Sequence, residues 1–336
     1  MKVTRVLVLL AVTAAWWGGP AAQPAGAEGC VRRGRRCSTP PARSGESKAR
    51  TEGMVAAASR LATGERVVVP IVYHVVYGSF VALRGEEPDD RDHAPALDLV
   101  QRQTQALNRA FRGTGFSFRT AEATLSDFAP WQSEPMPAGV LPAEEDLERM
   151  VRDLTANREA SLHVFLLREV ENRAAPPDTR SLFEDVAGTD AIVMDWDYLP
   201  YVEGLSPARD RALRRFYFEG DMLVHLVGHF AGLMHTFEEW PDEGDVDCKD
   251  ECGTTTDLVA DTPAHRWIWE EKVGRCIPLD TCKDAPGLDP MTNYMNLEPD
   301  LCASEFTPGQ VERMERMVRT FRPYLIVPAV DAEPPR

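Results

Sequence analysis

The chain has 336 residues, of which 43% are hydrophobic and 27% are charged, so it can bury the core of one large domain or two small ones. Its 53 acidic and 37 basic side chains give a formal net charge of −16, which argues against nucleic acid or an anionic membrane as the main partner. The charge is unevenly distributed along the chain. Residues 1–66 hold 11 basic and 4 acidic side chains, whereas the rest of the chain is acidic.

The first residues have the features of an export signal. Lys2 and Arg5 precede an apolar run from Val6 to Trp17, and small residues lead to a signal-peptidase site at 25–27. The alternative is a retained membrane anchor, although the run is shorter than the roughly 20 residues that a span needs. We therefore expect residues 1–27 to be a signal peptide, the protein to be secreted, and no membrane contact after signal removal.

Residues 28–66 are rich in Arg, Ser, Gly and Glu and lack apolar periodicity, which indicates an extended pro-segment outside the main fold. Cys30 and Cys37 lie in it. An oxidising compartment lets disulfides persist, so one interpretation of this pair is a small local disulfide.

Strand and helix patterns alternate from residue 67 onward. The β-branched and aromatic run at 67–77 predicts a strand buried on both faces, and His74 within it is expected to be a satisfied core histidine rather than a ligand. Further strands are predicted around Phe116 and Phe118, at 162–167 and at 191–194, and helices at 98–111, 143–157 and 308–319. The fold class is therefore mixed α/β or α+β, with a sheet packed on helices. Past His235 acidic loops and cysteines replace the periodic segments, which marks a second subdomain.

The segment from Asp221 to His235 carries the clearest chemical signal. His225 and His229 are four residues apart, so on a helix both imidazoles project from one face and can hold one metal ion. Gly232 can adopt the left-handed backbone that ends a helix, which lets His235 return as a third ligand. Three imidazoles with an open fourth position are typical of a catalytic zinc site.

This segment resembles the HExxHxxGxxH zinc signature of the metzincin metallopeptidases, and its flanks resemble the pappalysin family. The resemblance covers most of residues 67–325 and includes 73–76, 107–111, 115–118, 232–237, 257–263, 280–282, 293–295 and 306–310. It implies a metzincin-like fold of two subdomains. Residues 67–236 are expected to form a twisted sheet with helices above an active-site cleft, and residues 237–327 an irregular, disulfide-bonded subdomain below it. Residues 328–336 are then a tail.

The resemblance also implies roles for residues of the second subdomain. Met295 matches the methionine of the turn beneath the metal. The family's two disulfides are expected to join Cys252 to Cys276 and Cys282 to Cys302, which leaves Cys248 with Cys30 as its obvious partner if Cys37 is otherwise engaged.

Asp257 and Thr262 match a segment that binds calcium in some relatives. Oxygen ligands in a loop suit a hard cation, so a structural calcium is one hypothesis. A solvated acidic loop is the equally weighted alternative.

Two catalytic positions depart from the family pattern. The residue after the first histidine is Leu226 instead of the glutamate that acts as general base, and general acid–base catalysis contributes roughly 10²–10⁴-fold. Leu297 replaces a tyrosine that helps to stabilise charge on the substrate carbonyl. Asp221 and Glu219 are nearby carboxylates, but their helix position directs them away from the place of Leu226.

The cysteine of the front segment has a second interpretation. Arg-Arg-Cys37 resembles the family's pro-segment latch, in which a thiolate takes the fourth zinc position, and basic neighbours favour a thiolate. This latch and the Cys30–Cys37 disulfide exclude each other.

The leading hypothesis is a secreted zinc-binding protein of the metallopeptidase family, a pseudoenzyme with lost or much reduced hydrolysis. Such a protein could still act as a module that binds a peptide or protein in its cleft, where the strand at 191–194 offers an edge. One alternative is an active zinc metalloendopeptidase with a compensating base, and another is a purely structural zinc domain. Bound zinc leaves room for weak residual hydrolysis.

Overall fold

The computed structural model describes residues 37–38, 45–78, 97–133, 142–156, 160–168, 170, 172–175, 188–203, 216–237, 252, 257–266 and 276–328. The expected signal peptide at 1–27, Cys30 and Cys248 lie outside these residues. Within them, no helix is both long enough and apolar enough to cross a bilayer.

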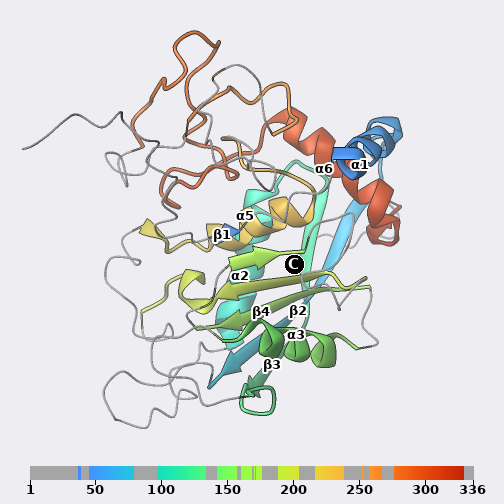
Figure 1. Cartoon of the computed structure of the whole chain (residues 1–336), viewed down its shortest axis with the longest axis vertical. Coiled ribbons are helices and arrows are strands. Elements are labelled where there is room, and N and C mark those ends of the chain that lie inside the picture. The colour runs from blue at the N-terminus through green and yellow to red at the C-terminus, as the bar shows by residue number, and fades with distance from the viewer. Residues whose placement is uncertain are drawn as a thin grey trace, which may run out of the picture.

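A twisted seven-stranded sheet forms the centre of the described part of the chain (Figure 1). Its strands are β1 (Cys37–Ser38), β2 (Arg66–Tyr77), β3 (Phe116–Asp127), β4 (Leu162–Leu167), β5 (Asn172–Ala174), β6 (Ala191–Asp195) and β7 (Ile326–Val327). Their order is β1-β5-β6-β4-β2-β3, and β7 pairs with the start of β2. Neighbours run parallel except for the pairs β5–β6 and β2–β7, which are antiparallel.

Helices cover both faces of this sheet. They are α1 (Gly45–Ala57), α2 (Leu97–Ala110), α3 (Glu144–Thr155), α5 (Asp221–Phe230) and α6 (Pro308–Phe321), with short 3₁₀ turns η2 (Trp196–Tyr198) and η3 (Pro323–Leu325). The strands and helices predicted from the sequence are thus confirmed, with small shifts at their ends. Asn108 fixes α2 to β3, because its amide donates to the Phe118 carbonyl at 2.8 Å and accepts from the Phe118 amide at 2.9 Å.

The core has two layers because successive side chains of a strand point to opposite faces. On β4, Val164 packs with α2 and α5 on one face, whereas Phe165 packs with Met150 of α3 on the other. Residues from both layers have no exposed surface. This burial explains why the central strands read as unbroken apolar runs in the sequence.

His74 is a core histidine, as expected. It is 1% exposed, and its Nε2 lies 3.0 Å from Nδ1 of His163 on β4. Its ring stacks on Phe165 with centroids 4.5 Å apart. The polar atoms of two buried imidazoles thus satisfy each other within the sheet.

The expectation that the strand at 191–194 offers a free edge is wrong. β6 is an interior strand, because it pairs with β4 on one side and with β5 on the other. Strand β5 could not be predicted from the sequence, because a three-residue strand has too few positions to show alternation. The edge beyond β6 is therefore β5, and β1 from the front segment pairs with it in parallel, Cys37 opposite Asn172.

Across α5 from the sheet, the described residues between 252 and 307 form turns and loops held by two disulfides (Figure 1). These link Cys252 to Cys282 and Cys276 to Cys302, with Cα atoms 5.2 and 5.3 Å apart. All four expected cysteines are therefore bridged, but the expected pairing is wrong.

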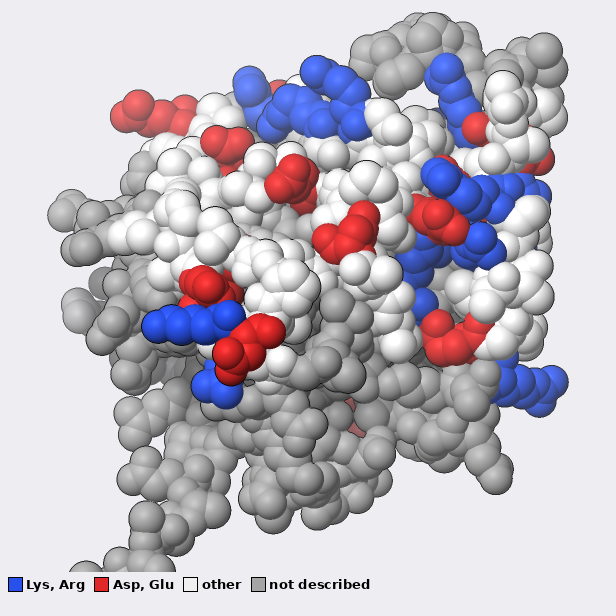
Figure 2. Space-filling view, turned by 90° about the horizontal axis from the view of Figure 1, so that it is seen from above, with Lys and Arg blue, Asp and Glu red and all other residues white. Residues whose placement is uncertain are grey.

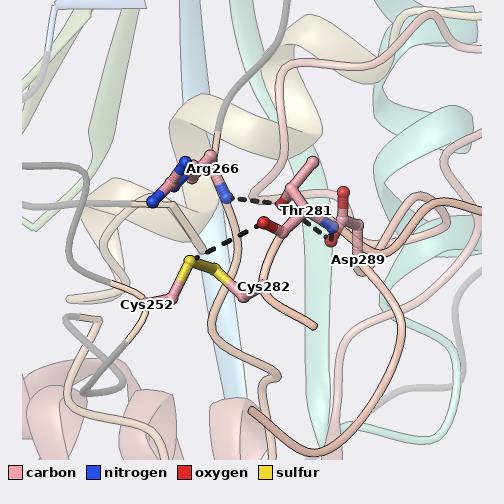
Figure 3. Close-up of a disulfide and its surroundings, with 5 residues drawn as sticks. All are labelled: Cys252, Arg266, Thr281, Cys282 and Asp289. Carbon is pink, nitrogen blue, oxygen red and sulfur yellow. Dashed lines mark hydrogen bonds between the residues drawn. A yellow bond between two sulfur atoms is a disulfide. The ribbon is translucent and has the colours of Figure 1, made fainter. Parts of the chain in front are cut away.

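A folded-back turn explains the actual pairing (Figure 3). The Asp289 carboxylate accepts from the Thr281 amide and hydroxyl, both at 2.9 Å, and the Arg266 amide donates to that hydroxyl. Cys252 Sγ then lies 3.7 Å from the Thr281 carbonyl oxygen, beside Cys282. Such long-range contacts leave no mark in cysteine spacing.

Candidate metal centre

Helix α5 carries the first two histidines of the motif and lies between the sheet and the irregular part (Figure 1). Its sequence is apolar at nearly every position, and the residues from Met222 to Phe230 are all buried. Gly232 adopts φ +95°, which ends the helix and turns the chain. A Cβ at this position would collide with Met317 of α6. The turn returns His235 to the same side as His225 and His229.

The three imidazoles converge on one point. Their Nε2 atoms are 3.0 Å apart between His229 and His225, 3.2 Å between His225 and His235, and 3.3 Å between His229 and His235. The three residues are at most 4% exposed. Among the described residues, they are the only cluster of His, Cys, Asp or Glu whose ligand atoms can share one metal ion.

Hydrogen bonds determine which ring nitrogen carries the proton on two of them. Nδ1 of His225 lies 2.8 Å from the Tyr294 carbonyl, and Nδ1 of His229 lies 2.9 Å from the Leu233 carbonyl. A carbonyl only accepts, so each Nδ1 donates and each Nε2 keeps its lone pair. Burial lowers the pKa of His225 to about 4 and that of His229 to about 3, so both are neutral. Lone pairs aimed at one point repel each other without a cation, so this donor set fits a metal ion.

Met295 lies directly beneath the helix, as expected for the turn methionine. It has no exposed surface, and a Cβ placed on Gly228 would collide with its sulfur. Gly228 is thus required between the two histidines by close packing. The turn is fixed by Asn293, whose side chain accepts from the Met295 amide at 2.9 Å and exchanges two hydrogen bonds with Gln310 of α6.

The two leucines stand where the family pattern has polar catalytic groups. Leu226 has no exposed surface and belongs to the main core cluster, and Leu297 packs against the same cluster. A hydrocarbon side chain neither accepts a proton nor donates to a carbonyl. Among the described residues, no carboxylate joins the three histidines. Residues 238–251, which follow the motif and include several acids, lie outside the described residues.

Asp221 belongs to an acidic group at the opening of α5. Burial, followed by the negative charges of Asp300 and Glu219, raises the pKa of Asp221 to about 8. Asp300 accepts from the backbone amides of Phe218, Glu219 and Gly220 at 2.7–3.2 Å and so anchors the segment that leads into the helix. Burial raises the pKa of Asp300 to about 6 against the opposing effect of these amides.

A buried arginine that the motif does not indicate holds the other end of α5. Arg322 has no exposed surface, donates to the Phe230 carbonyl at 2.9 Å and stacks 4.0 Å over the Phe230 ring. Its charge is balanced by Asp190, which also accepts from Tyr324. No local pattern could have identified it, because Asp190 and Arg322 are 132 residues apart.

His265 is a fourth histidine close to the motif. Its Nε2 lies 2.9 Å from the hydroxyl of Thr236, and its ring meets Phe237, which stacks on His235. Burial lowers the pKa of His265 to about 4. It therefore packs, as a neutral group, against Thr236 and Phe237, the two residues that follow the third ligand.

Asp257 and Thr262, the expected calcium ligands, are adjacent and each 1% exposed. The Thr262 hydroxyl lies 2.9 and 2.7 Å from the two carboxylate oxygens of Asp257, and the Val259 amide donates to one of them at 3.1 Å. Burial raises the pKa of Asp257 to about 6. The solvated-loop alternative is wrong, because the pair is buried and bonded internally.

The fold, with its cluster of three histidines, is of the metzincin type. The chain shares its fold with mature mirolysin of Tannerella forsythia, solved in complex with a cleaved peptide, at a TM-score of 0.52 and 21% identity, over 77% of this chain and 97% of that one.

The sequence comparisons show the family. The family model Peptidase_M43, described as pregnancy-associated plasma protein-A, matches residues 218–319. Extracellular metalloproteases of Trichophyton verrucosum and Arthroderma benhamiae are 29% and 30% identical, over 66% and 67% of this chain and 71% and 67% of their own lengths. One of Colletotrichum graminicola is 30% identical over 66% of this chain and 69% of its own. The chain belongs to this pappalysin family of extracellular, metal-dependent peptidases.

Proposed function

We propose that the chain is a secreted zinc-binding member of this family whose peptidase activity is absent or much reduced. The observation that carries the proposal is one helix that presents His225 and His229 to a shared point and places Leu226 between them. The ligand set is retained while the general base is replaced by a hydrocarbon.

Zinc is the metal that best suits this donor set. Three neutral imidazole nitrogens without a carboxylate are borderline-soft donors, which favour zinc over calcium or magnesium. When bound, zinc supplies Lewis acidity toward a peptide carbonyl and lowers the pKa of water. The residues of this chain hold the ion and fix the ligand rings through the carbonyls of Tyr294 and Leu233.

Loss of two groups supports the loss of hydrolysis. Leu226 cannot take a proton from the attacking water, a step worth roughly 10²–10⁴-fold. Leu297 cannot donate a hydrogen bond to the developing oxyanion, which is worth roughly 10²–10³-fold in other enzymes. Asp221 is an unsuitable substitute base, because it lies at the start of α5 and its carboxylate does not join the three histidines.

A cleft that holds a metal ion but does not hydrolyse peptides can still bind them. The parallel pairing of β1 with β5 is the kind of contact by which an extended chain adds to a sheet edge. A peptide or protein segment that displaces residues 37–38 from this edge is therefore the proposed ligand. The same pairing attaches part of residues 28–66 to the folded body, which supports them as a pro-segment, and Cys37 stays a proposed latch.

Metal content and hydrolysis test the main proposal. Purified protein is expected to hold one zinc per chain, and His225→Ala, His229→Ala and His235→Ala to lose it, as measured by elemental analysis after dialysis. Against a diverse peptide library, the wild type is expected to show no chelator-sensitive cleavage after removal of the residues ahead of α1. Cleavage that a chelator abolishes would favour the rival, an active endopeptidase whose base comes from elsewhere.

The purely structural zinc domain is distinguished by ligand binding. It predicts that no peptide binds the zinc-loaded protein, whereas the binding module predicts peptides that compete with residues 28–66. The calcium proposal has its own test, because a chelator selective for calcium is expected to lower the melting temperature. An unchanged melting temperature would count against the Asp257 and Thr262 site.

A further inference from the structure

Helix α1 is attached to the C-terminal helix α6, although the sequence places α1 within the pro-segment (Figure 1). Arg316 of α6 donates to the carbonyls of Ala56 and Ala58 at 2.9 and 2.7 Å, at the end of α1. Val55 is 4% exposed, so α1 also has a buried apolar contact. Seen from above, acidic and basic side chains lie next to one another on this molecule (Figure 2).

One of the ion pairs between these helices continues to the metal site. Glu52 of α1 accepts two hydrogen bonds from Arg313 of α6, at 2.8 and 2.9 Å. The remaining nitrogen of that guanidinium, Nε, donates to the Gly232 carbonyl at 2.9 Å. Arg313 is 8% exposed, so its end of this charge-assisted chain is largely shielded from solvent, whereas the Glu52 side chain is 31% exposed.

Gly232 is the residue at which the chain leaves α5 and turns toward its third ligand. Its carbonyl is held by Arg313, and its α-carbon packs against Met317 with no room for a Cβ. Only two residues separate Gly232 from His235. The orientation of this peptide therefore sets where the third imidazole is delivered.

We propose that Arg313 is a positioning residue for His235 and that Glu52 of α1 holds Arg313 in place. Helix α1 thus helps to position the third ligand of the metal site. Residues 45–66 stay docked on α6 when the segment ahead of them is cleaved. This proposal rests on the proposed zinc binding, but the positioning claim has a readout that needs no metal.

The test uses full-length chains that carry Glu52→Gln or Arg313→Lys. Glu312→Gln is the matched control, because Glu312 also pairs with an arginine of α6, Arg316, but does not reach Gly232. Hydrogen exchange of metal-free protein is expected to be roughly tenfold faster at residues 232–236 in both test variants, and unchanged in the control. Competition with a chelator is expected to show zinc binding about tenfold weaker in the test variants.

A double-mutant cycle separates positioning from general destabilisation. If Glu52 acts through His235, Glu52→Gln is expected to leave zinc affinity unchanged in a His235→Ala background. An equal loss in both backgrounds, or unchanged exchange at residues 232–236, would overturn the proposal. A wild type that fails to bind zinc would refute the proposed function, and the exchange data would still decide the positioning role.

Discussion

At the scale of single residues, the metal site depends on close packing around two glycines as much as on its ligands. Gly228 gives room to Met295 beneath the helix, and Gly232 gives room to Met317 above the turn. The sequence predicted the backbone role of Gly232 and the ligand role of the histidines from spacing alone. The resemblance also placed Met295 beneath the metal, but the contact with Met317 could not be predicted, because Met317 lies far away in the chain.

Replacing Gly232 is expected to destabilise the protein by two separable effects. Gly232→Ala forces a left-handed backbone on alanine, which costs about 1–2 kcal/mol, and overpacks against Met317, which adds about 1–3 kcal/mol. Gly113 is the control, because it also has a positive φ, +86°, with nothing within 4 Å of its Cβ direction. Urea unfolding should therefore show a larger loss for Gly232→Ala than for Gly113→Ala, and equal losses would contradict the packing argument.

The acidic group at the start of α5 predicts a pH dependence of stability. Unfolded Asp221 ionises near a pKa of 3.8 and folded Asp221 near about 8, because burial disfavours its charge. Between these values the unfolded state binds fewer protons, so rising pH lowers the stability that this residue contributes. Asp221→Asn removes this pH dependence. The melting temperature of the variant minus that of the wild type is therefore expected to increase from pH 5 to pH 8. A constant difference across this range would refute the assignment.

At the scale of elements, α5 is held at both ends by groups from distant parts of the chain. Asp300 binds the amides of the residues that lead into it, and Arg322 binds the carbonyl of Phe230 at its last residue. The helix itself could be predicted, since a local pattern of apolar residues, histidines and a terminal glycine specifies it. Its anchors could not, because each is fixed by tertiary packing and neither has a motif of its own.

The buried pair of Arg322 and Asp190 is expected to be important for stability. Arg322→Met leaves the Asp190 carboxylate buried without its cation, which costs about 3–5 kcal/mol. Adding Asp190→Asn is expected to restore part of this loss, so the double variant should lose less than the two single variants together. The surface pair Arg152–Glu148 is the control, because Arg152→Met should cost less than about 1 kcal/mol. Strict additivity in urea unfolding would contradict this account.

At the scale of the whole molecule, the sequence predicted the fold class and the family. It failed on connections that only the folded chain determines. Strand β5, between β1 and β6, is three residues long, and the disulfide partners follow a turn set by Thr281 and Asp289. A four-cysteine set allows three pairings, and spacing does not select among them.

Disulfide mapping checks the arrangement of the irregular part. Proteolysis of the unreduced protein, followed by mass spectrometry, is expected to release linked peptides that contain Cys252 with Cys282 and Cys276 with Cys302. The same experiment reports on the front segment, because a Cys30–Cys37 bridge would exclude the latch. Peptides that join Cys252 to Cys276 would contradict the fold of residues 252–307.

The central claim is that the metal site is complete and only the catalytic groups are missing. The most direct measurement is peptide hydrolysis by zinc-loaded Leu226→Glu beside wild type, with Leu226→Gln as an isosteric control that cannot take a proton, and with zinc content and melting temperature recorded for each. We predict an inactive wild type, an inactive Leu226→Gln, and chelator-sensitive cleavage by Leu226→Glu at least roughly 10²-fold above both. Cleavage by the wild type at the level of Leu226→Glu would contradict the account and show that this chain is a working peptidase with another base.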